Sequence, residues 1–457
     1  MRIALTAVAG GIGLGLLAAG PVPAAEEAAG AEGASSAERI DTLERKIRIL
    51  TQEVQSLRHD HPTTGPDGGV AAKEAGQTYG FGRSASEVYR QSESGVSWAG
   101  YGEAHVRLSD ERPDVDPGGG DRSSFFRQTL YLGYRFSDRF LVNSELEVSH
   151  SHDIASEFAY LDFLYSDRLR LRAGLLLAPL GLINQQHEPT DYWGNHRPLL
   201  AKVLIPTAMR ENGAGAYGTL GGQWQYFLYV MNSLDGKGLR PDSLAGARQN
   251  GWSGRLGART EDVALTGRFD WVPLVGVRAG ISAWHGDTGQ RQAFDGGRPD
   301  VPLTLADVHA QWDRGPWRVR GVYAEARIGD TRAVNRYLQN EGVLGDLVGA
   351  VPERMTGWYL EAGYDVLAGW QRAGRQALYP WVRFTRVDTQ AELADAVTDE
   401  GFEADPALDR RVVTVGLHYL PHPSIVVKGE YRDWSSTDSG PGTNNHAEAR
   451  LGFGYRF

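Results

Sequence analysis

The last eleven residues of the chain, 447–457, read AEARLGFGYRF and alternate between two kinds of side chain. The odd positions are apolar or aromatic, whereas the even positions hold Glu448, Arg450, Arg456 and two glycines. Successive side chains of a β-strand point to opposite faces, so this period of two predicts a strand with one apolar and one polar face. The same alternation recurs at 96–108 and at 139–150.

Working backwards from this stretch, we predict sixteen strands. They are 96–108, 123–136, 139–150, 157–165, 169–177, 213–219, 223–232, 262–271, 275–286, 303–313, 317–328, 355–366, 376–388, 409–420, 424–434 and 446–457. Their links alternate between tight turns, such as Ser137-Asp138 and Gly221-Gly222, and long loops, the longest being 178–212. A soluble sandwich would also alternate in polarity, but short turns at one end and long loops at the other are typical of outer-membrane barrels. The sequence therefore predicts an all-β, sixteen-stranded antiparallel transmembrane β-barrel.

The composition excludes several other classes. The chain has 457 residues, 58 glycines, no cysteine and 41% hydrophobic residues, with a formal net charge of -10. The absence of cysteine excludes a disulfide scaffold and a thiol nucleophile. The negative mean hydropathy argues against a helical membrane bundle. The acidic balance argues against a nucleic-acid partner.

The N-terminal quarter divides into segments of different character. Residues 1–25 have a basic start, an apolar run and small residues near Ala24 and Ala25, which predicts a cleaved signal peptide, with an uncleaved anchor as the alternative. Residues 38–58 carry apolar side chains at spacings of three and four, which predicts a periplasmic coiled-coil helix; a lone amphipathic helix is the alternative. Residues 59–95, rich in Gly, Ser, Thr and Pro, are expected to be a flexible linker to a barrel at 96–457.

A sixteen-stranded barrel is wide enough to leave an aqueous channel, so the inward side chains carry the functional expectation. Strand parity places a set of basic residues inward, as candidate pore-lining or anion-binding groups. They are Arg107, Arg127, Arg135, Arg170, Arg172, Arg268, Arg278, Arg318, Arg320 and Arg383. Guanidinium groups suit phosphate and carboxylate geometry. The alternative is that these arginines only pair with inward acids and keep the lumen wet.

The link 178–212 is too apolar for a freely solvated loop, so we expect it to fold into the lumen as a constriction. Its charged and polar candidates are His187, Glu188, Arg197, Lys202 and Arg210. His187, Glu188, Asp191 and His196 match no helical metal motif, so we expect loop packing and neither a metal site nor a cofactor. The acidic loop 389–408 is expected either to bridge to lipopolysaccharide through divalent cations or, as we favour, to be solvated.

Several motifs together resemble one known family. They include the run 130–140 (LYLGYRFSDRF), the run 157–163 (EFAYLDF), the run 172–181 (RAGLLLAPLG), His187-Glu188-Pro189 and the run 210–213 (RENG). These residues are similar to the phosphate-selective porin O and P family, across roughly 96–457. The resemblance implies a trimeric, sixteen-stranded porin with an arginine-lined pathway and a constriction loop after the fifth strand. The family's lysine cluster is missing, because the barrel holds only Lys202, Lys237 and Lys428.

The sequence thus predicts a non-enzymatic outer-membrane porin for passive diffusion of small anions, with phosphate as the candidate solute. Its expected partners are further copies of itself in a homotrimer, together with outer-membrane lipid and lipopolysaccharide. A general small-solute porin without phosphate specificity is the main alternative. A barrel hydrolase using Ser149 or Ser151 with His150 and His152, and a tether that uses 38–58 to hold a periplasmic partner, are further alternatives.

Overall fold

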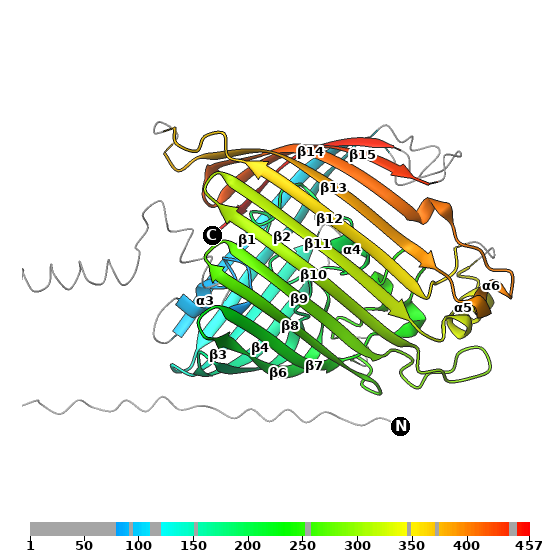
Figure 1. Cartoon of the computed structure of the whole chain (residues 1–457). Coiled ribbons are helices and arrows are strands. Elements are labelled where there is room, and N and C mark those ends of the chain that lie inside the picture. The colour runs from blue at the N-terminus through cyan, green and yellow to red at the C-terminus, as the bar shows by residue number, and fades with distance from the viewer. Residues whose placement is uncertain are drawn as a thin grey trace, which may run out of the picture. The chain divides into compact units, whose positions relative to one another are not determined.

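A computed structural model describes residues 79–90, 95–109, 120–149, 154–251, 257–344, 349–370, 374–437 and 446–457. The chain forms a closed barrel of tilted strands in this part (Figure 1). The expected signal peptide at 1–25 and coiled coil at 38–58 lie outside the described residues, and so do His150, Ser151 and His152.

Sixteen strands among the described residues confirm the predicted fold class. They are β1 (Gly95–Ser109), β2 (Arg122–Arg135), β3 (Phe140–Ser149), β4 (Ile154–Ser166), β5 (Leu169–Leu177), β6 (Arg210–Leu220), β7 (Trp224–Asn232), β8 (Val263–Leu274), β9 (Val277–Asp287), β10 (Pro302–Arg314), β11 (Trp317–Ile328), β12 (Arg354–Tyr364), β13 (Ala377–Glu392), β14 (Asp409–His422), β15 (Ile425–Ser436) and β16 (Ala447–Arg456). Each strand pairs antiparallel with its sequence neighbours, and β16 closes the barrel on β1.

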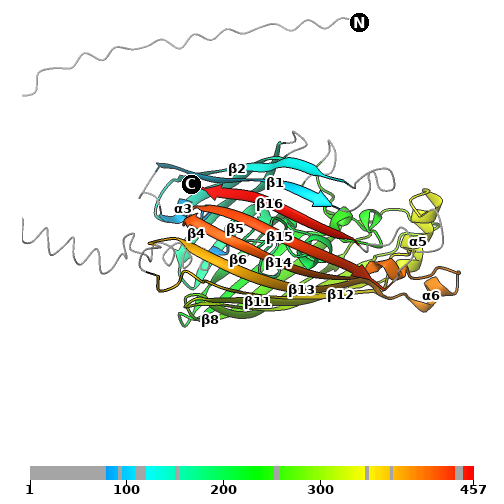
Figure 2. The same ribbon diagram turned by 90° about the horizontal axis from the view of Figure 1, so that it is seen from above.

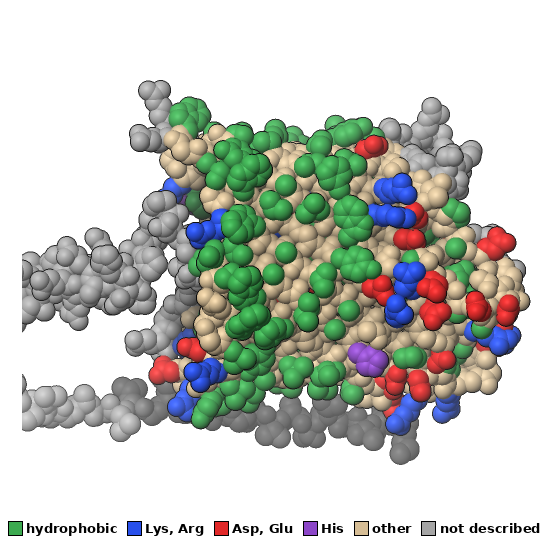
Figure 3. Space-filling model, in the orientation of Figure 1, with side chains coloured by type: hydrophobic (Ala, Val, Ile, Leu, Met, Phe, Trp, Pro, Cys, Tyr) green, Lys and Arg blue, Asp and Glu red, His purple; other side chains and the backbone are tan. Residues whose placement is uncertain are grey.

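The alternation of the sequence becomes the two faces of the wall. On β1, Trp98 is 61% exposed on the outer face, while its neighbour Ser97 and the inward Glu103 are buried. Large apolar side chains cover the outside of the barrel, and the charged ones gather towards its ends (Figure 3). Since water is absent from a hydrocarbon layer, a closed barrel with an apolar outside and no free strand edge is the strand arrangement that can cross it.

The two ends of the barrel differ. Tight turns, α3 (Glu87–Arg90) and the C-terminus lie at one end, whereas α5 (Thr331–Asn340) and α6 (Asp395–Thr398) lie at the other (Figures 1 and 2). Exposed aromatic side chains such as Trp271, Trp317 and Phe457 stand near the tight turns, as an interfacial girdle requires. In outer-membrane barrels the tight turns face the periplasm, so α5 and α6 belong to the extracellular end. No helix within the described ranges is long and apolar enough to span a membrane.

The expectation of a flexible linker at 59–95 is wrong for the part of it that the structure describes. Residues 79–89, here called the plug, fold into the periplasmic half of the barrel against β2, β3 and β4. Phe81, Ala85 and Val88 are each buried to 2% exposure or less. The aromatic and apolar residues of this segment provide buried area that outweighs its glycine and serine content, so it docks on the wall.

Candidate functional site: the constricted lumen

The link predicted to fold into the lumen contacts several strands of the wall. Residues 178–209, here called the lumenal loop, leave β5 and cross the interior of the barrel before β6 begins. Arg127 Nη2 on β2 donates to the carbonyl oxygen of His187 at 2.8 Å, and the Tyr192 hydroxyl donates to Glu103 on β1 at 2.7 Å. The loop is therefore fastened to the wall on the side of the closing strands.

The loop also contacts β12 to β15, which follow β16 and β1 around the closed barrel. Trp193 packs against Tyr379 with ring centroids 5.1 Å apart, and His418 lies edge-on to it at 5.3 Å. Gly363 makes room for the indole, because a Cβ built there would lie 2.7 Å from the Trp193 ring. Lys428 Nζ on β15 donates to the carbonyl oxygen of Gly194 at 2.7 Å. The loop is therefore held to the wall along an arc of strands from β2 through β1 to β12, and it occupies part of the bore.

The plug occupies further space in the periplasmic half of the barrel. The Tyr89 hydroxyl donates to Asp162 Oδ2 at 2.6 Å, and Arg172 Nη2 donates to the same hydroxyl at 3.1 Å. The Arg172 guanidinium lies 4.6 Å from the centre of the Phe81 ring of the plug. Asn143 Nδ2 donates to the carbonyl oxygen of Ala85 at 3.0 Å. The polar wall of β3, β4 and β5 thus forms a seat for the plug.

Glu188 connects the lumenal loop to the plug. Its carboxylate accepts hydrogen bonds from the backbone N–H of Ser84 at 2.8 Å and of Ala85 at 3.2 Å. Burial, followed by the nearby charge of Asp191, raises the pKa of Glu188 to about 7. The constriction is therefore one assembly of loop, plug and wall.

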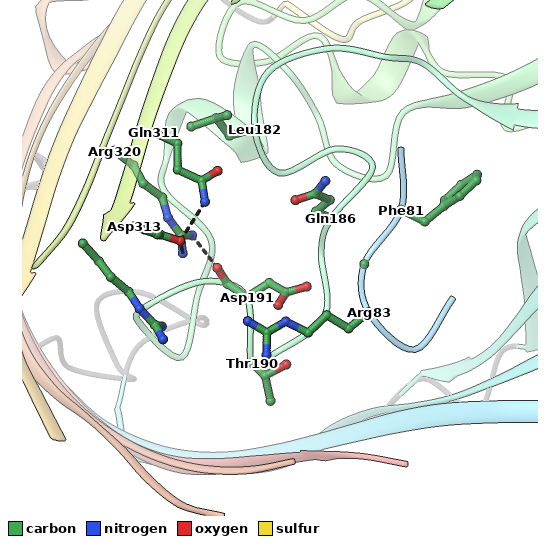
Figure 4. Close-up of a pocket in the computed structure, with 11 residues that line it drawn as sticks. Phe81, Arg83, Leu182, Gln186, Thr190, Asp191, Gln311, Asp313 and Arg320 are labelled. Atoms are coloured by element: carbon green, nitrogen blue, oxygen red, sulfur yellow. Dashed lines mark hydrogen bonds and ion pairs between the residues drawn. The ribbon is translucent and has the colours of Figure 1, made fainter. Parts of the chain in front are cut away.

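A cavity of about 40 Å³ lies where these three parts meet (Figure 4). The plug contributes Arg83 to its lining, the loop contributes Asp191, and the wall contributes Asp313, Arg318 and Arg320. Arg320 Nη1 donates to the backbone carbonyl of Asp191, and the side chains of Arg83 and Asp191 point toward one another in Figure 4. A space of this size holds a few water molecules.

All ten predicted pore arginines point inward, but most of them are neutralised. Counting only partners in the part of the chain that the structure describes, seven form ion pairs with carboxylates: Arg127, Arg170, Arg172, Arg268, Arg278, Arg320 and Arg383. Several pairs join directly opposite residues of neighbouring strands, as with Glu103 and Arg127. The alternative that the arginines pair with inward acids therefore describes most of the wall. Arg172 and Arg268 also hold the plug and the loop, because Arg172 contacts Tyr89 and Arg268 donates to the Gly181 carbonyl.

The other three arginines have different surroundings. Arg135 donates to the carbonyl oxygen of Tyr89 in the plug at 3.1 Å, and Arg107 donates to that of Gly120 at 3.1 Å. The Arg318 guanidinium lies 4.3 Å from the centre of the Tyr379 ring. Arg107 stands near the extracellular end of β1, directly opposite Arg450 on β16. Two like charges facing each other across a ladder raise the local positive potential.

A basic cluster gathers on the extracellular side of the lumenal loop. It consists of Lys202 in α4 (Leu200–Val203), Arg432 on β15 and Arg450 on β16. Both arginines bind Glu448, each at 2.8 Å. Lys202 is exposed to water although the wall surrounds it. Enclosure by the wall, followed by the charges of Arg432 and Arg450, lowers the pKa of Lys202 to about 8.

His196 in the lumenal loop lies close to the same positive charges. Its ring lies 5.1 Å from that of His105 on β1, and its Nε2 accepts from Arg450 Nη1. Burial, followed by the charges of Lys202 and Arg450, holds the pKa of His196 well below its usual value. The imidazole is therefore a neutral acceptor at physiological pH.

The remaining loop candidates serve the loop's own packing. His187 Nδ1 lies 3.0 Å from the Asn184 carbonyl, and burial lowers the pKa of His187 to about 3. Arg197 donates to the Thr207 carbonyl at 2.9 Å. Arg210 is the first residue of β6 and belongs to the wall, where it pairs with Glu157 at 3.1 Å. Within the described part of the chain, no group of three or more His, Asp or Glu residues could hold a metal ion.

The acids of the extracellular loops are partly paired as well. Glu400, next to α6, forms ion pairs with Arg332 and Arg336 of α5. Glu392 at the end of β13 pairs with Arg354 of β12 at 2.8 Å. The expectation that this loop is simply solvated is therefore wrong for these two acids, because neighbouring arginines face them.

Comparison with known proteins finds one relative in sequence. No family model matches the chain. A protein of Aquifex aeolicus (strain VF5), described only as uncharacterized, is 32% identical over 377 residues, which cover 79% of this chain and 81% of the relative. The chain belongs to the same family as this protein. The resemblance to the phosphate-selective porins stays a prediction.

One solved structure with a TM-score of 0.50 shows the fold, and two others are similar at lower scores. The Salmonella typhi OmpF complex with daunomycin matches with a TM-score of 0.50 at 11% identity, covering 80% of this chain and 98% of that one. DcaP of Acinetobacter baumannii has a TM-score of 0.49 at 13% identity over 80% of this chain and 98% of its own. The anion-selective porin from Comamonas acidovorans has 0.47 at 12% identity over 80% of this chain and 100% of its own. With its apolar outer face, the protein is a bacterial outer-membrane barrel of porin-like architecture.

Proposed function

We propose that the protein is a channel for passive diffusion of small hydrophilic solutes across the outer membrane, and that it prefers anions. The barrel supports this proposal because its polar, charged face is turned inward and its apolar face outward. The lumenal loop supports it because a loop folded into the bore is the element that sets the selectivity of such channels.

The basic cluster is the observation that carries the anion preference. Lys202, Arg432 and Arg450 stand together on the extracellular side of the constriction, with Glu448 bound to both arginines. A positive field inside a low-dielectric wall raises the local concentration of anions and lowers their entry cost. The paired arginines lower on the wall contribute little net charge.

Phosphate is the solute that we propose to test first. Guanidinium groups bind phosphate oxygens through paired N–H donors, and arginines supply two of the three cations of the cluster. The scarcity of lysine in the barrel leaves a general small-anion channel as the alternative within the same class.

The test is a planar-bilayer measurement of reversal potential under a potassium chloride gradient, followed by replacement of chloride with phosphate. We expect anions to carry most of the current, and Lys202→Ala to shift the reversal potential toward zero. Arg332→Ala is the matched control, because Arg332 is a half-exposed cation paired with Glu400 in an extracellular loop. A cation preference in the unaltered protein would reject the anion proposal and leave the channel proposal standing.

We also propose a homotrimer in contact with lipopolysaccharide, with residues 38–58 assisting assembly. Deleting 38–58 tests this second proposal by light scattering of the detergent-solubilised protein. Loss of the trimer would assign these residues to assembly. Intact trimers with altered attachment to the cell envelope would assign them to a periplasmic partner.

A further inference from the structure

The wall side chains that bind the plug also bind one another. Arg172 Nε binds Asp162 Oδ1 at 2.7 Å within the wall, and the Tyr217 hydroxyl also donates to Asp162. Asn143 has a second wall partner in the Tyr160 hydroxyl at 3.1 Å. If residues 79–89 left the bore, Arg172, Asp162 and Asn143 would keep these hydrogen-bond partners on the wall. Release of the plug would therefore leave none of these three buried polar side chains without a partner.

Hydrogen bonds and apolar packing, and no covalent cross-link, hold the plug in the bore. Backbone hydrogen bonds to Glu188, Arg135 and Asn143 and the side-chain hydrogen bonds of Tyr89 and Ser84 hold its polar groups. Its fully buried apolar side chains are Phe81, Ala85 and Val88. Water can replace each of these hydrogen bonds once the segment is released. No covalent bond holds the segment in the bore other than the chain itself, because the protein has no cysteine.

The cavity next to the plug shows why this segment matters for transport. Its 40 Å³ accommodate a few water molecules beside Arg83, Asp191 and the wall. The plug supplies Phe81, Gly82 and Arg83 to this lining. Removing the plug would widen the passage at this level and leave the lumenal loop in place.

We propose that residues 79–89 form a releasable gate: docked between Glu188 and the wall of β2 to β5 they close the periplasmic side of the lumen, and released they open it. This inference rests on the proposed channel function. The segment that docks on the wall is residues 79–89 of this same chain. The Glu188 carboxylate binds its backbone N–H groups, and the Arg172 guanidinium lies over its Phe81 ring.

A disulfide lock tests the gate in a chain that has no other cysteine. A Cβ built at Gly133 on β2 lies 2.5 Å from Val88 Cγ1, so a Val88→Cys, Gly133→Cys pair brings the two sulfur atoms within bonding reach. A Gly321→Cys, Leu360→Cys pair is the matched control, because it links directly opposite residues of β11 and β12 on the outer face. Single-channel conductance is measured under oxidising conditions and again after reduction.

The gate predicts that the oxidised Val88–Gly133 variant loses its conductance steps and that reduction restores them, while the control pair conducts equally in both states. Equal conductance of the lock variant in both states would overturn the gate. If no variant conducts in either state, including one with residues 79–89 deleted, the channel proposal itself fails, which separates the two failures.

Thiol labelling gives a second readout that does not depend on the lock. Val88 and Leu141 are equally buried, at 1% and 0% exposure, but Leu141 belongs to the wall strand β3. A releasable plug predicts that a membrane-impermeant thiol reagent labels Val88→Cys in the folded protein much faster than Leu141→Cys. Adding Glu188→Ala should accelerate labelling of position 88 alone. Equal protection of both positions would contradict release.

Discussion

The Glu188 carboxylate of the lumenal loop accepts the backbone N–H of Ser84 at 2.8 Å and the Ser84 hydroxyl at 3.1 Å. A side chain 104 positions later in the sequence thus holds the plug by its backbone. The contact is close, because a Cβ built at Gly82 would lie 2.4 Å from a Glu188 oxygen. This contact makes the width of the lumen depend on the position of a segment that precedes the barrel.

The first prediction concerns pH. Glu188 faces Asp191 of its own loop, Ser84 and Arg83 of the plug, and Arg456 of β16, and burial raises its pKa to about 7 from 4.5. Release of the plug would hydrate the carboxylate and lower this pKa, so docking takes up a proton between about pH 4.5 and pH 7. Docking is therefore favoured at acid pH and weakens as the pH rises to about 7. We expect conductance to rise over this interval.

The control for this pH dependence is Glu188→Gln, which keeps an acceptor oxygen but cannot ionise. Its conductance should vary less with pH between 4.5 and 7 than that of the unaltered protein. An unchanged pH profile in this variant would assign the effect to another group.

The second prediction concerns Lys202. Enclosure by the wall and the charges of Arg432 and Arg450 lower its pKa to about 8, so this lysine loses its positive charge as the pH rises through that value. Anion preference should therefore fall between about pH 7 and pH 9, as measured by reversal potential. Lys202→Arg should keep its charge over this range and flatten the dependence. An equally steep dependence in the arginine variant would exclude Lys202 as its source.

The third prediction concerns stability. Arg172 and Asp162 form an ion pair with side-chain exposures of 1% and 0%. Arg172→Ala leaves a buried carboxylate without its cation, which costs about 3–5 kcal/mol of unfolding free energy. The matched control is Arg170→Ala, two residues away on the same strand, whose partner Asp167 is 92% exposed. It should cost less than Arg172→Ala, because the exposed Asp167 carboxylate stays hydrated when its cation is removed. Urea titration followed by heat-modifiable gel mobility measures both, and equal losses would contradict the burial argument.

The sequence was sufficient to predict the barrel, because the period of two survives in every strand. The boundaries differ by a few residues in both directions: β13 runs to Glu392 where 388 was expected, whereas β12 ends at Tyr364 where 366 was expected. The lumenal loop was also predictable, since residues such as Leu199 and Leu200 would not be left in water. These features depend on local patterning and on the hydrophobicity of short segments.

The pairing of the arginines and the plug could not be predicted in the same way. Whether Arg383 meets Glu361 depends on the register between β12 and β13, and alternation alone does not set that register. The plug lies in a polar, glycine-rich segment, and its signal was the three aromatic residues Tyr79, Phe81 and Tyr89 within eleven positions. Their seat is built from strands that follow far along the chain.

The fourth prediction concerns the far side of the lumenal loop. Trp193 is 1% exposed and packs against Tyr379, Trp381 and His418. Trp193→Ala should remove this anchor at a cost of about 3–5 kcal/mol and loosen the loop on the side of β13 and β14. We expect a larger single-channel conductance. Trp98→Phe on the lipid-facing surface is the control and should leave conductance unchanged. Unaltered conductance in both variants would show that this anchor does not limit the passage.

The central claim is that the bore conducts and that its basic cluster favours anions. The most direct measurement is the reversal potential of the purified protein with residues 79–89 deleted, in a planar bilayer under a potassium chloride gradient. We predict open channels whose potential has the sign of anion selectivity and moves toward zero in Lys202→Ala. Channels with the sign of cation selectivity, or a folded barrel that passes no current, would contradict it.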